Sequence, residues 1–247
     1  MQCVDGSGSI SSRTAPSPVG AAVGSGAGCL ASPDARVRVV PGRASRALLT
    51  RLRDATSDAA VFCAYLDRAC TLLAEEALAQ DHLVSVREIR TPNGPCLGYF
   101  CKRAEELCAV SIMRSGDLLL EPLRRLVPGI AVGKLLIQRD EASRDKHAVM
   151  IYDKLPRDVA SRHVLLCDPM LATGGSAIKA IQCLVAHGVA AKSITFINLV
   201  SCPEGIAALV GAFPEVIIVT LAIDEGLTEN KYIYPGLGDC GDRALST

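Results

Sequence analysis

One stretch, VLLCDPMLATGGSAIKA from position 164 to position 180, combines an apolar run, an acidic residue and a small polar loop with paired glycines. Its apolar start predicts a buried strand, and the segment after the paired glycines predicts a helix. Gly174 and Gly175 permit close backbone approach to a ligand, while Thr173 and Ser176 offer hydroxyl donors. Because the N–H groups and the positive dipole end of a helix N-terminus attract anions, the loop predicts a phosphate site.

Asp168 lies at the end of the predicted strand, just before this loop. A carboxylate there can accept paired hydrogen bonds from a cis-diol, so the acid and the loop together suggest ribose 5-phosphate. A T-G-G turn alone is more often an ordinary strand-to-helix connection, and the functional interpretation depends on the strand, the acid and the loop occurring together. The loop is not a nucleotide-hydrolase P-loop, because no G-x-x-x-x-G-K-[ST] pattern occurs in the sequence, and the loop lacks the G-x-G-x-x-G spacing of a dinucleotide site.

Strands and helices alternate around the loop. We expect strands at 107–113, 131–138, 163–167, 193–200 and 216–223, and helices at 117–127, 176–188 and 204–213. Apolar strands separated by helices predict an α/β fold with a doubly wound, mainly parallel sheet. In such sheets ligands bind beyond the carboxyl ends of the strands, which is where Asp168 and its loop lie.

Three other segments complete the predicted organisation. A Ser/Thr-capped amphipathic helix is expected over 56–80, with one face made of Ala60, Cys63, Leu66, Cys70, Leu73 and Ala77. The charged segment 139–158 is interpreted as a projecting β-arm that ends in the strand AVMIYDKL. Residues 1–35 are rich in Gly, Ser and Pro and predict a disordered tail, which leaves 36–247 as one domain.

Composition narrows the class of protein. The 247 residues are 49% hydrophobic and carry a formal net charge of zero, so no global field recruits nucleic acid or an anionic membrane. We expect no membrane span and no secretory signal, and therefore a cytoplasmic protein. Eleven cysteines form no C-x-x-C pair, and the four histidines add no metal-ligand spacing. We interpret most of the cysteines as small buried hydrophobes in a reducing compartment, and we predict no dedicated metal site.

Four motifs resemble those of a known family. DPMLATGGS resembles the phosphoribosyl diphosphate (PRPP) signature of type I phosphoribosyltransferases, in the form found in uracil phosphoribosyltransferases. SIMRSG and LLIQRDE resemble the two arginine motifs of that family, and YIYPGLGDCGDR resembles its C-terminal uracil loop. Most relatives carry two adjacent acids before the phosphate loop, whereas Pro169 occupies the second position here. The resemblance covers about 36–247 and implies the type I fold with a C-terminal base-binding hood loop.

The resemblance implies transfer of ribose 5-phosphate from PRPP to N1 of uracil, giving UMP and diphosphate in pyrimidine salvage. It assigns PRPP binding to Arg114, Arg139, Asp168, Pro169, Met170, Leu171, Ala172, Thr173, Gly174, Gly175, Ser176 and Asp239. It assigns uracil binding to Ile233, Gly238, Asp239 and Cys240, and catalysis to Arg114, Arg139 and Asp239. Mg²⁺ is expected to arrive with PRPP, a homodimer or homotetramer is implied, and GTP is a candidate effector.

Three alternatives stay open beside this interpretation. The first is an RNA-binding regulator of the same fold, which predicts a basic face that the balanced charge does not favour. The second is a non-catalytic homologue, and the third is a purine-specific transferase. Ser115 and Cys240 stand where alanine is common in the family, so their effect on the site is left open.

Overall fold

The computed structural model describes residues 35–139 and 148–245. The predicted disordered tail, apart from residue 35, lies outside the described residues, as does the segment 140–147 within the predicted β-arm. Both therefore stay predictions. Within the described residues, no helix combines the length and the apolar character that a membrane crossing requires.

The centre of the fold is an eight-stranded sheet in the order β1-β10-β9-β7-β4-β5-β6, with β8 beside β9. Its strands are β1 (Val37–Val39), β4 (Leu107–Met113), β5 (Ala131–Arg139), β6 (Ala148–Lys154), β7 (His163–Cys167), β8 (Met170–Leu171), β9 (Ile194–Ser201) and β10 (Ile217–Ile223). Every neighbouring pair is parallel except β5 and β6. The predicted doubly wound, mainly parallel sheet is therefore confirmed, with β6 as an antiparallel edge.

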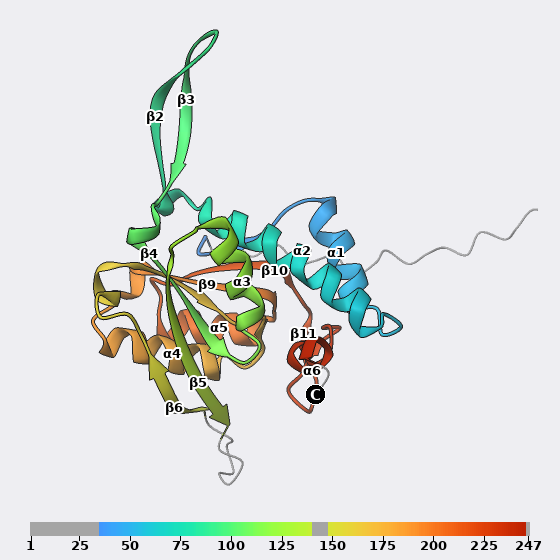
Figure 1. The fold of residues 1–247 in the computed structure, drawn as a ribbon. Helices are drawn as coiled ribbons and strands as arrows, with labels where there is room; N and C mark the ends of the chain where they lie inside the picture. The colour runs from blue at the N-terminus through green and yellow to red at the C-terminus, as the bar shows by residue number, and fades with distance from the viewer. Residues whose placement is uncertain (1–34, 140–147, 246–247) are drawn as a thin grey trace, which may run out of the picture.

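Helices cover both faces of this sheet (Figure 1). One layer contains α1 (Arg43–Arg53), α2 (Ala59–Leu78) and α3 (Asp117–Leu126), and the other contains α4 (Gly175–Ala186) and α5 (Pro203–Ala212). Strand β7 shows why two layers are needed, because Val164 and Leu166 join the core with α4 and α5, while Leu165 and Cys167 join the core with α1 to α3. Short 3₁₀ helices connect the elements at η1 (Asp81–Leu83), η2 (Ala104–Glu106), η3 (Val159–Ser161) and η4 (Ala191–Ser193).

The long helix α2 differs in detail from its prediction. Its N-cap is Asp58, whose carboxylate accepts from the backbone N–H of Val61 at 2.8 Å, and not a serine or threonine. Ala60 and Cys63 are exposed, so the buried face begins at Phe62. The sequence pattern assigned Cys63 to the buried face, whereas the structure buries the preceding residue, Phe62. Phe62 carries more apolar surface than either of its neighbours.

A second hairpin, absent from the sequence prediction, projects from the body of the protein (Figure 1). It consists of β2 (Val84–Thr91) and β3 (Gly94–Cys101), paired in register from Val84 with Cys101 to Thr91 with Gly94. Most residues on both strands are exposed, among them Tyr99 at 74%.

The chain ends in a short segment beyond β10. It contains a small ladder of β11 (Gly226–Leu227) and β12 (Ile233–Tyr234), followed by α6 (Cys240–Leu245). Figure 1 shows this segment beside the far end of α2, away from the β2–β3 hairpin. Three residues of this segment, Ile233, Leu237 and Cys240, are buried in the core shared with α1 to α3.

Candidate functional site

One cavity of about 590 Å³ lies where the chain leaves β7. Its walls are Ser115, the loop 168–177, and residues 230–233 and 238–241 of the C-terminal segment. The cavity therefore joins two stretches that are far apart in the sequence. Nine consecutive positions predicted to bind PRPP, 168–176, line it together with all four positions predicted to bind uracil, Ile233, Gly238, Asp239 and Cys240.

Backbone hydrogen bonds join the first residues of the loop 168–176 to strand β9. The N–H of Asp168 donates to the carbonyl of Ile197 at 3.2 Å, and the N–H of Leu199 donates to the carbonyl of Pro169 at 2.9 Å. β8 then pairs with β9, from Met170 with Val200 to Leu171 with Ser201. Because these bonds fix the backbone before the glycines, the loop reaches the N-terminus of α4 in a defined position.

Two glycines allow the loop and the two helices to meet. Gly174 is the N-cap of α4 and has φ +82°, a conformation that residues with a Cβ seldom adopt. Gly205, in the first turn of α5, has no room for a side chain, because a Cβ would lie 2.4 Å from the carbonyl oxygen of Ala172. The start of α5 therefore supports the loop directly.

An ion pair fixes the start of the C-terminal segment. Asp224 follows β10 and is buried, and its carboxylate accepts from the Arg53 guanidinium at 2.6 and 2.7 Å and from the N–H of Gly236 at 2.8 Å. Arg53 also donates to the carbonyl of Gly236 at 2.8 Å. Gly236 has φ +60°, and a Cβ there would lie 2.1 Å from the carbonyl oxygen of Ile233, so the turn requires glycine.

Arg243 fixes the other end of this segment. Its guanidinium donates to the carbonyl of Leu237 at 2.7 Å, to that of Asp54 at 3.0 Å and to that of Leu52, and it lies 4.2 Å from the centroid of the Phe62 ring. α6 is thereby joined to the last turn of α1 and the first turns of α2. Residues 230–241 are held at both ends by contacts with the N-terminal helices.

Cys240 marks where the two walls of the cavity approach each other. Burial, followed by the nearby carboxylates of Asp168 and Asp239, raises the pKa of its thiol to about 12. The side chain is 2% exposed. At neutral pH it is therefore a neutral thiol that shapes the site, not a nucleophile.

The loop after β4 brings Ser115 to the cavity. Gly116 follows it, and a Cβ on this glycine would lie 2.3 Å from the carbonyl oxygen of Cys167 and 2.6 Å from that of Ile112. Asp117 then begins α3 and accepts from the Lys134 ammonium at 2.6 Å, which ties the loop to β5. Arg114 is exposed and follows β4 across a cis Met113–Arg114 peptide bond.

Among the described side chains, Arg114 does not line the cavity, although it is adjacent in sequence to Ser115, which does. Arg139 is the last residue of β5, and the position of its side chain lies outside what the structure describes. The structure also adds lining residues that the sequence prediction left out: Ala177, Asn230, Lys231, Tyr232 and Gly241. The C-terminal motif itself offered a signal for Tyr232, which is its first residue.

A family model described as uracil phosphoribosyltransferase matches residues 39–247. The chain belongs to the uracil phosphoribosyltransferase family. A uracil phosphoribosyltransferase of Saccharomyces cerevisiae is 44% identical over 200 residues, covering 79% of this chain and 89% of the relative. Uracil phosphoribosyltransferase 1 of Schizosaccharomyces pombe is 42% identical over 202 residues, covering 82% and 90%.

A solved structure and a longer relative complete the comparison with the uracil phosphoribosyltransferase family. The structure of the AQ2163 protein of Aquifex aeolicus superposes with a TM-score of 0.72 at 30% identity, covering 85% of this chain and 98% of that one. Uridine kinase-like protein 4 of Arabidopsis thaliana is 40% identical over 205 residues, but the chain covers only 42% of its length. The predicted family and the predicted mainly parallel α/β fold are both confirmed, whereas the projecting β-arm and the base-binding hood loop stay predictions.

Proposed function

We propose that the chain transfers ribose 5-phosphate from PRPP to N1 of uracil, giving UMP and diphosphate in pyrimidine salvage. The observation that carries this proposal is the single cavity shared by the loop 168–177 and the C-terminal segment 230–241. One wall has the groups for a sugar phosphate, and the other has a glycine-rich loop for a flat base. Membership of the family supports the same reaction.

The loop forms the phosphate end of the proposed site. The first N–H groups of α4 have no partner inside the helix, and together with the hydroxyls of Thr173 and Ser176 they suit the 5-phosphate. Asp168, at the carboxyl end of β7, is the acceptor for the ribose hydroxyls. Pro169, Met170, Leu171 and Ala172 connect the two and contribute backbone.

Stabilisation of the charge that develops at the reacting centre is assigned to Arg114, Arg139 and Asp239. Bond cleavage leaves positive charge on the anomeric carbon and adds negative charge to the departing diphosphate. A carboxylate at position 239 can stabilise the first, and the two guanidinium groups can stabilise the second. Arg114 follows β4 directly before Ser115, which lines the cavity, and Arg139 is the last residue of β5, which pairs with β4; these positions support an approach to the diphosphate when substrate is present.

The C-terminal segment forms the base end. Uracil presents O2 and O4 as acceptors and N3–H as a donor, which backbone groups of a tight loop can match. Ile233 and Cys240 are buried and supply the walls, whereas Gly238 and Asp239 are exposed towards the cavity. Gly238 has φ +78°, so its peptide groups adopt directions that residues with a Cβ seldom allow.

Mg²⁺ is proposed to enter with PRPP. The donors that line the cavity fit this ion, because Mg²⁺ is commonly held by one or two carboxylates, water and substrate phosphates. Asp168 and Asp239 are the two carboxylates available there, and Pro169 provides no ligand in the position of a second adjacent acid. The ion would supply charge neutralisation of the diphosphate.

The oligomeric state, the compartment and a candidate effector are also proposed. We propose a homodimer or homotetramer, supported by the exposed apolar residues of the β2–β3 hairpin, Val86, Ile89, Leu97 and Tyr99. All nine described cysteines are free, and five of them are buried, which supports a cytoplasmic, reducing compartment. GTP is retained as a candidate effector.

A direct assay tests the proposed reaction. Purified protein is incubated with Mg²⁺, PRPP and radiolabelled uracil, with and without GTP, and UMP and diphosphate are quantified. Equal amounts of the two products are expected, and Arg139→Ala should lower kcat by roughly 30-fold or more, equivalent to about 2 kcal/mol of transition-state stabilisation. Formation of a purine nucleotide, or no UMP from folded protein, would contradict the proposal.

A further inference from the structure

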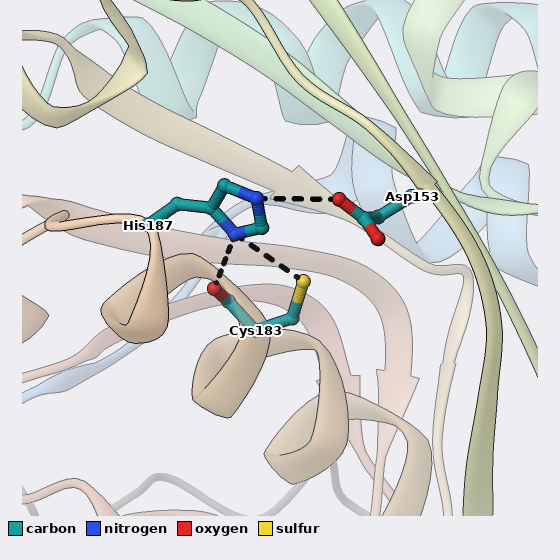
Figure 2. Close-up of side chains that lie close together, drawn as sticks. All are labelled: Asp153, Cys183 and His187. Atoms are coloured by element: carbon teal, nitrogen blue, oxygen red, sulfur yellow. Dashed lines mark hydrogen bonds and ion pairs between the residues drawn. The ribbon is translucent and has the colours of Figure 1, made fainter.

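Three potential metal ligands meet on the surface away from the substrate cavity. They are Asp153 on β6, Cys183 on α4 and His187, the C-cap residue of α4, and their ligand atoms all lie within 4.8 Å of one another. Figure 2 shows the imidazole between the carboxylate and the thiol. None of the three lines the cavity proposed for PRPP and uracil.

The hydrogen bonds of His187 determine which nitrogen is available. Its Nδ1 lies 2.9 Å from the carbonyl oxygen of Cys183, and because a carbonyl only accepts, Nδ1 carries a proton. In the neutral imidazole the lone pair is then on Nε2, which faces the Asp153 carboxylate at 3.3 Å. An N–H to carbonyl bond of this kind is the usual way in which a metal-binding imidazole is oriented.

The spacing of the ligand atoms suits a small tetrahedral ion. With metal–nitrogen and metal–oxygen bonds of about 2.0 to 2.2 Å, two zinc ligands are separated by about 3.4 Å, close to the separation of Nε2 and the Asp153 oxygen. The Cys183 sulfur lies 3.7 Å from Nδ1 of the same ring. One ligand atom from each of the three residues lies within 4.8 Å of the other two, so the thiol is near enough to share one ion with them.

The dipole of helix α4 favours a cation at this site. Cys183 and His187 lie four residues apart in the last turn of α4, where the carbonyl groups give a helix its partial negative charge. A cation at this end of the 12-residue helix is stabilised by that charge as well as by Asp153.

We propose that Asp153, Cys183 and His187 form a binding site for a divalent transition-metal ion of the Zn²⁺ class, with one coordination position open to water. On binding, the Cys183 sulfur forms a bond to the metal and its proton leaves to solvent. The mixed sulfur, nitrogen and oxygen set favours Zn²⁺ over Mg²⁺, which prefers oxygen ligands alone. A bound ion would join β6 to the end of α4, whose other end forms the phosphate loop.

Cobalt spectroscopy on the full-length, reduced and EDTA-stripped protein tests this site without substrate. Titration with Co²⁺ should give one equivalent of saturable binding, with a sulfur-to-cobalt charge-transfer band and the visible bands of tetrahedral Co²⁺, and Zn²⁺ should displace it. Cys183→Ser should abolish the charge-transfer band. Asp153→Asn and His187→Gln should each weaken binding tenfold or more, since even outer ligands of metal sites contribute that much.

Matched controls separate this site from adventitious thiol binding. Cys63→Ser and Cys96→Ser remove exposed cysteines outside the cluster and should leave the band and the affinity unchanged. Circular dichroism and an unchanged Tm without metal verify that each variant folds, and Zn²⁺ should raise the Tm of the parent but not of Cys183→Ser. Absence of saturable binding, a band that persists in Cys183→Ser, or a band lost in Cys63→Ser would overturn the proposal.

Discussion

Arg53 and Asp224 form a two-pronged ion pair between the end of α1 and the end of β10, although 171 residues separate them in the sequence. The Asp224 side chain is 5% exposed and that of Arg53 is 26% exposed. Because the same carboxylate accepts from the N–H of Gly236, the pair positions the turn that leads into the proposed uracil loop.

Arg53→Ala is therefore expected to weaken uracil binding and to lower the free energy of unfolding. Removal of the guanidinium leaves a buried carboxylate with less compensation, at a cost of about 2 to 3 kcal/mol. We expect the KM for uracil to rise more than tenfold, with a smaller change in the KM for PRPP. Arg51→Ala is the matched control, since its ion pair with Asp54 is exposed and should contribute little.

Asp168→Asn should preserve folding and reduce kcat/KM for PRPP by about 10- to 100-fold. An amide cannot accept from both ribose hydroxyls, and hydrogen bonds to a charged group contribute about 1.5 to 3 kcal/mol. Steady-state kinetics at saturating uracil measures this effect. Asp67→Asn serves as the control, because that carboxylate pairs with Arg125 on an exposed surface, and equal kinetics for both variants would remove Asp168 from the site.

Gly116→Ala should destabilise the fold by about 2 kcal/mol or more and displace the Arg114–Ser115 loop. The added methyl would overlap three backbone atoms, the carbonyl oxygens of Cys167 and Ile112 and the nitrogen of Ile112, and none of these is the end of a flexible side chain. Denaturant unfolding measures the loss. Gly211→Ala in α5 is the control, because a Cβ there meets nothing within 4 Å and should stabilise the helix by up to about 1 kcal/mol.

His163 should make stability fall as the pH is lowered. Burial lowers its pKa to about 3, whereas in the unfolded chain the value is near 6.5, so the unfolded state binds the proton first as the pH falls through 6.5. Stability is therefore complete above about pH 7 and is reduced by up to about 3 kcal/mol at pH 4. His163→Gln should flatten this slope, measured as the free energy of unfolding at several pH values.

Cytosine should be rejected relative to uracil by about 10⁴-fold or more in kcat/KM. The two rings have nearly the same shape, but cytosine places an amino donor and a ring acceptor where uracil has an acceptor and a donor. Each mismatch leaves a buried group unpaired. Cys240→Ala should alter tolerance of 5-substituted uracils more than this ratio, because the thiol is a neutral wall; comparable rates for the two bases would contradict recognition by the loop.

The core of the fold was predictable because its strands are buried on both faces. The segment 163–167 reads as five consecutive core residues, and its helix α4 shows a clear apolar face with glycines before it. The β2–β3 hairpin gave no such pattern, since most residues on both strands are exposed. The sequence TPNG was the available signal, because Pro92 and Asn93 form the turn between the paired residues Thr91 and Gly94.

Part of the site could likewise be predicted from the sequence and part could not. The loop 168–176 is continuous in sequence, so its chemistry can be interpreted locally. The four cavity-lining positions predicted to bind uracil came from the resemblance of one motif. The ties made by Arg53 and Arg243 depend on partners more than 170 residues away, and no local pattern indicates them. Likewise, Cys183 and His187 have a helical spacing of four, but the third member of the cluster comes from a strand about 30 residues earlier.

The contacts of Arg243 with Leu52 and Asp54 also set an order on folding during synthesis. Helix α1 is synthesised long before α6, because almost the whole described part of the chain lies between them. The sheet and the phosphate loop can form while synthesis continues, but closure over such a separation comes late because its entropy is lost before the contacts form. During synthesis the loop 168–176 is therefore made, and can fold, before the segment 230–241 closes the proposed site for the base.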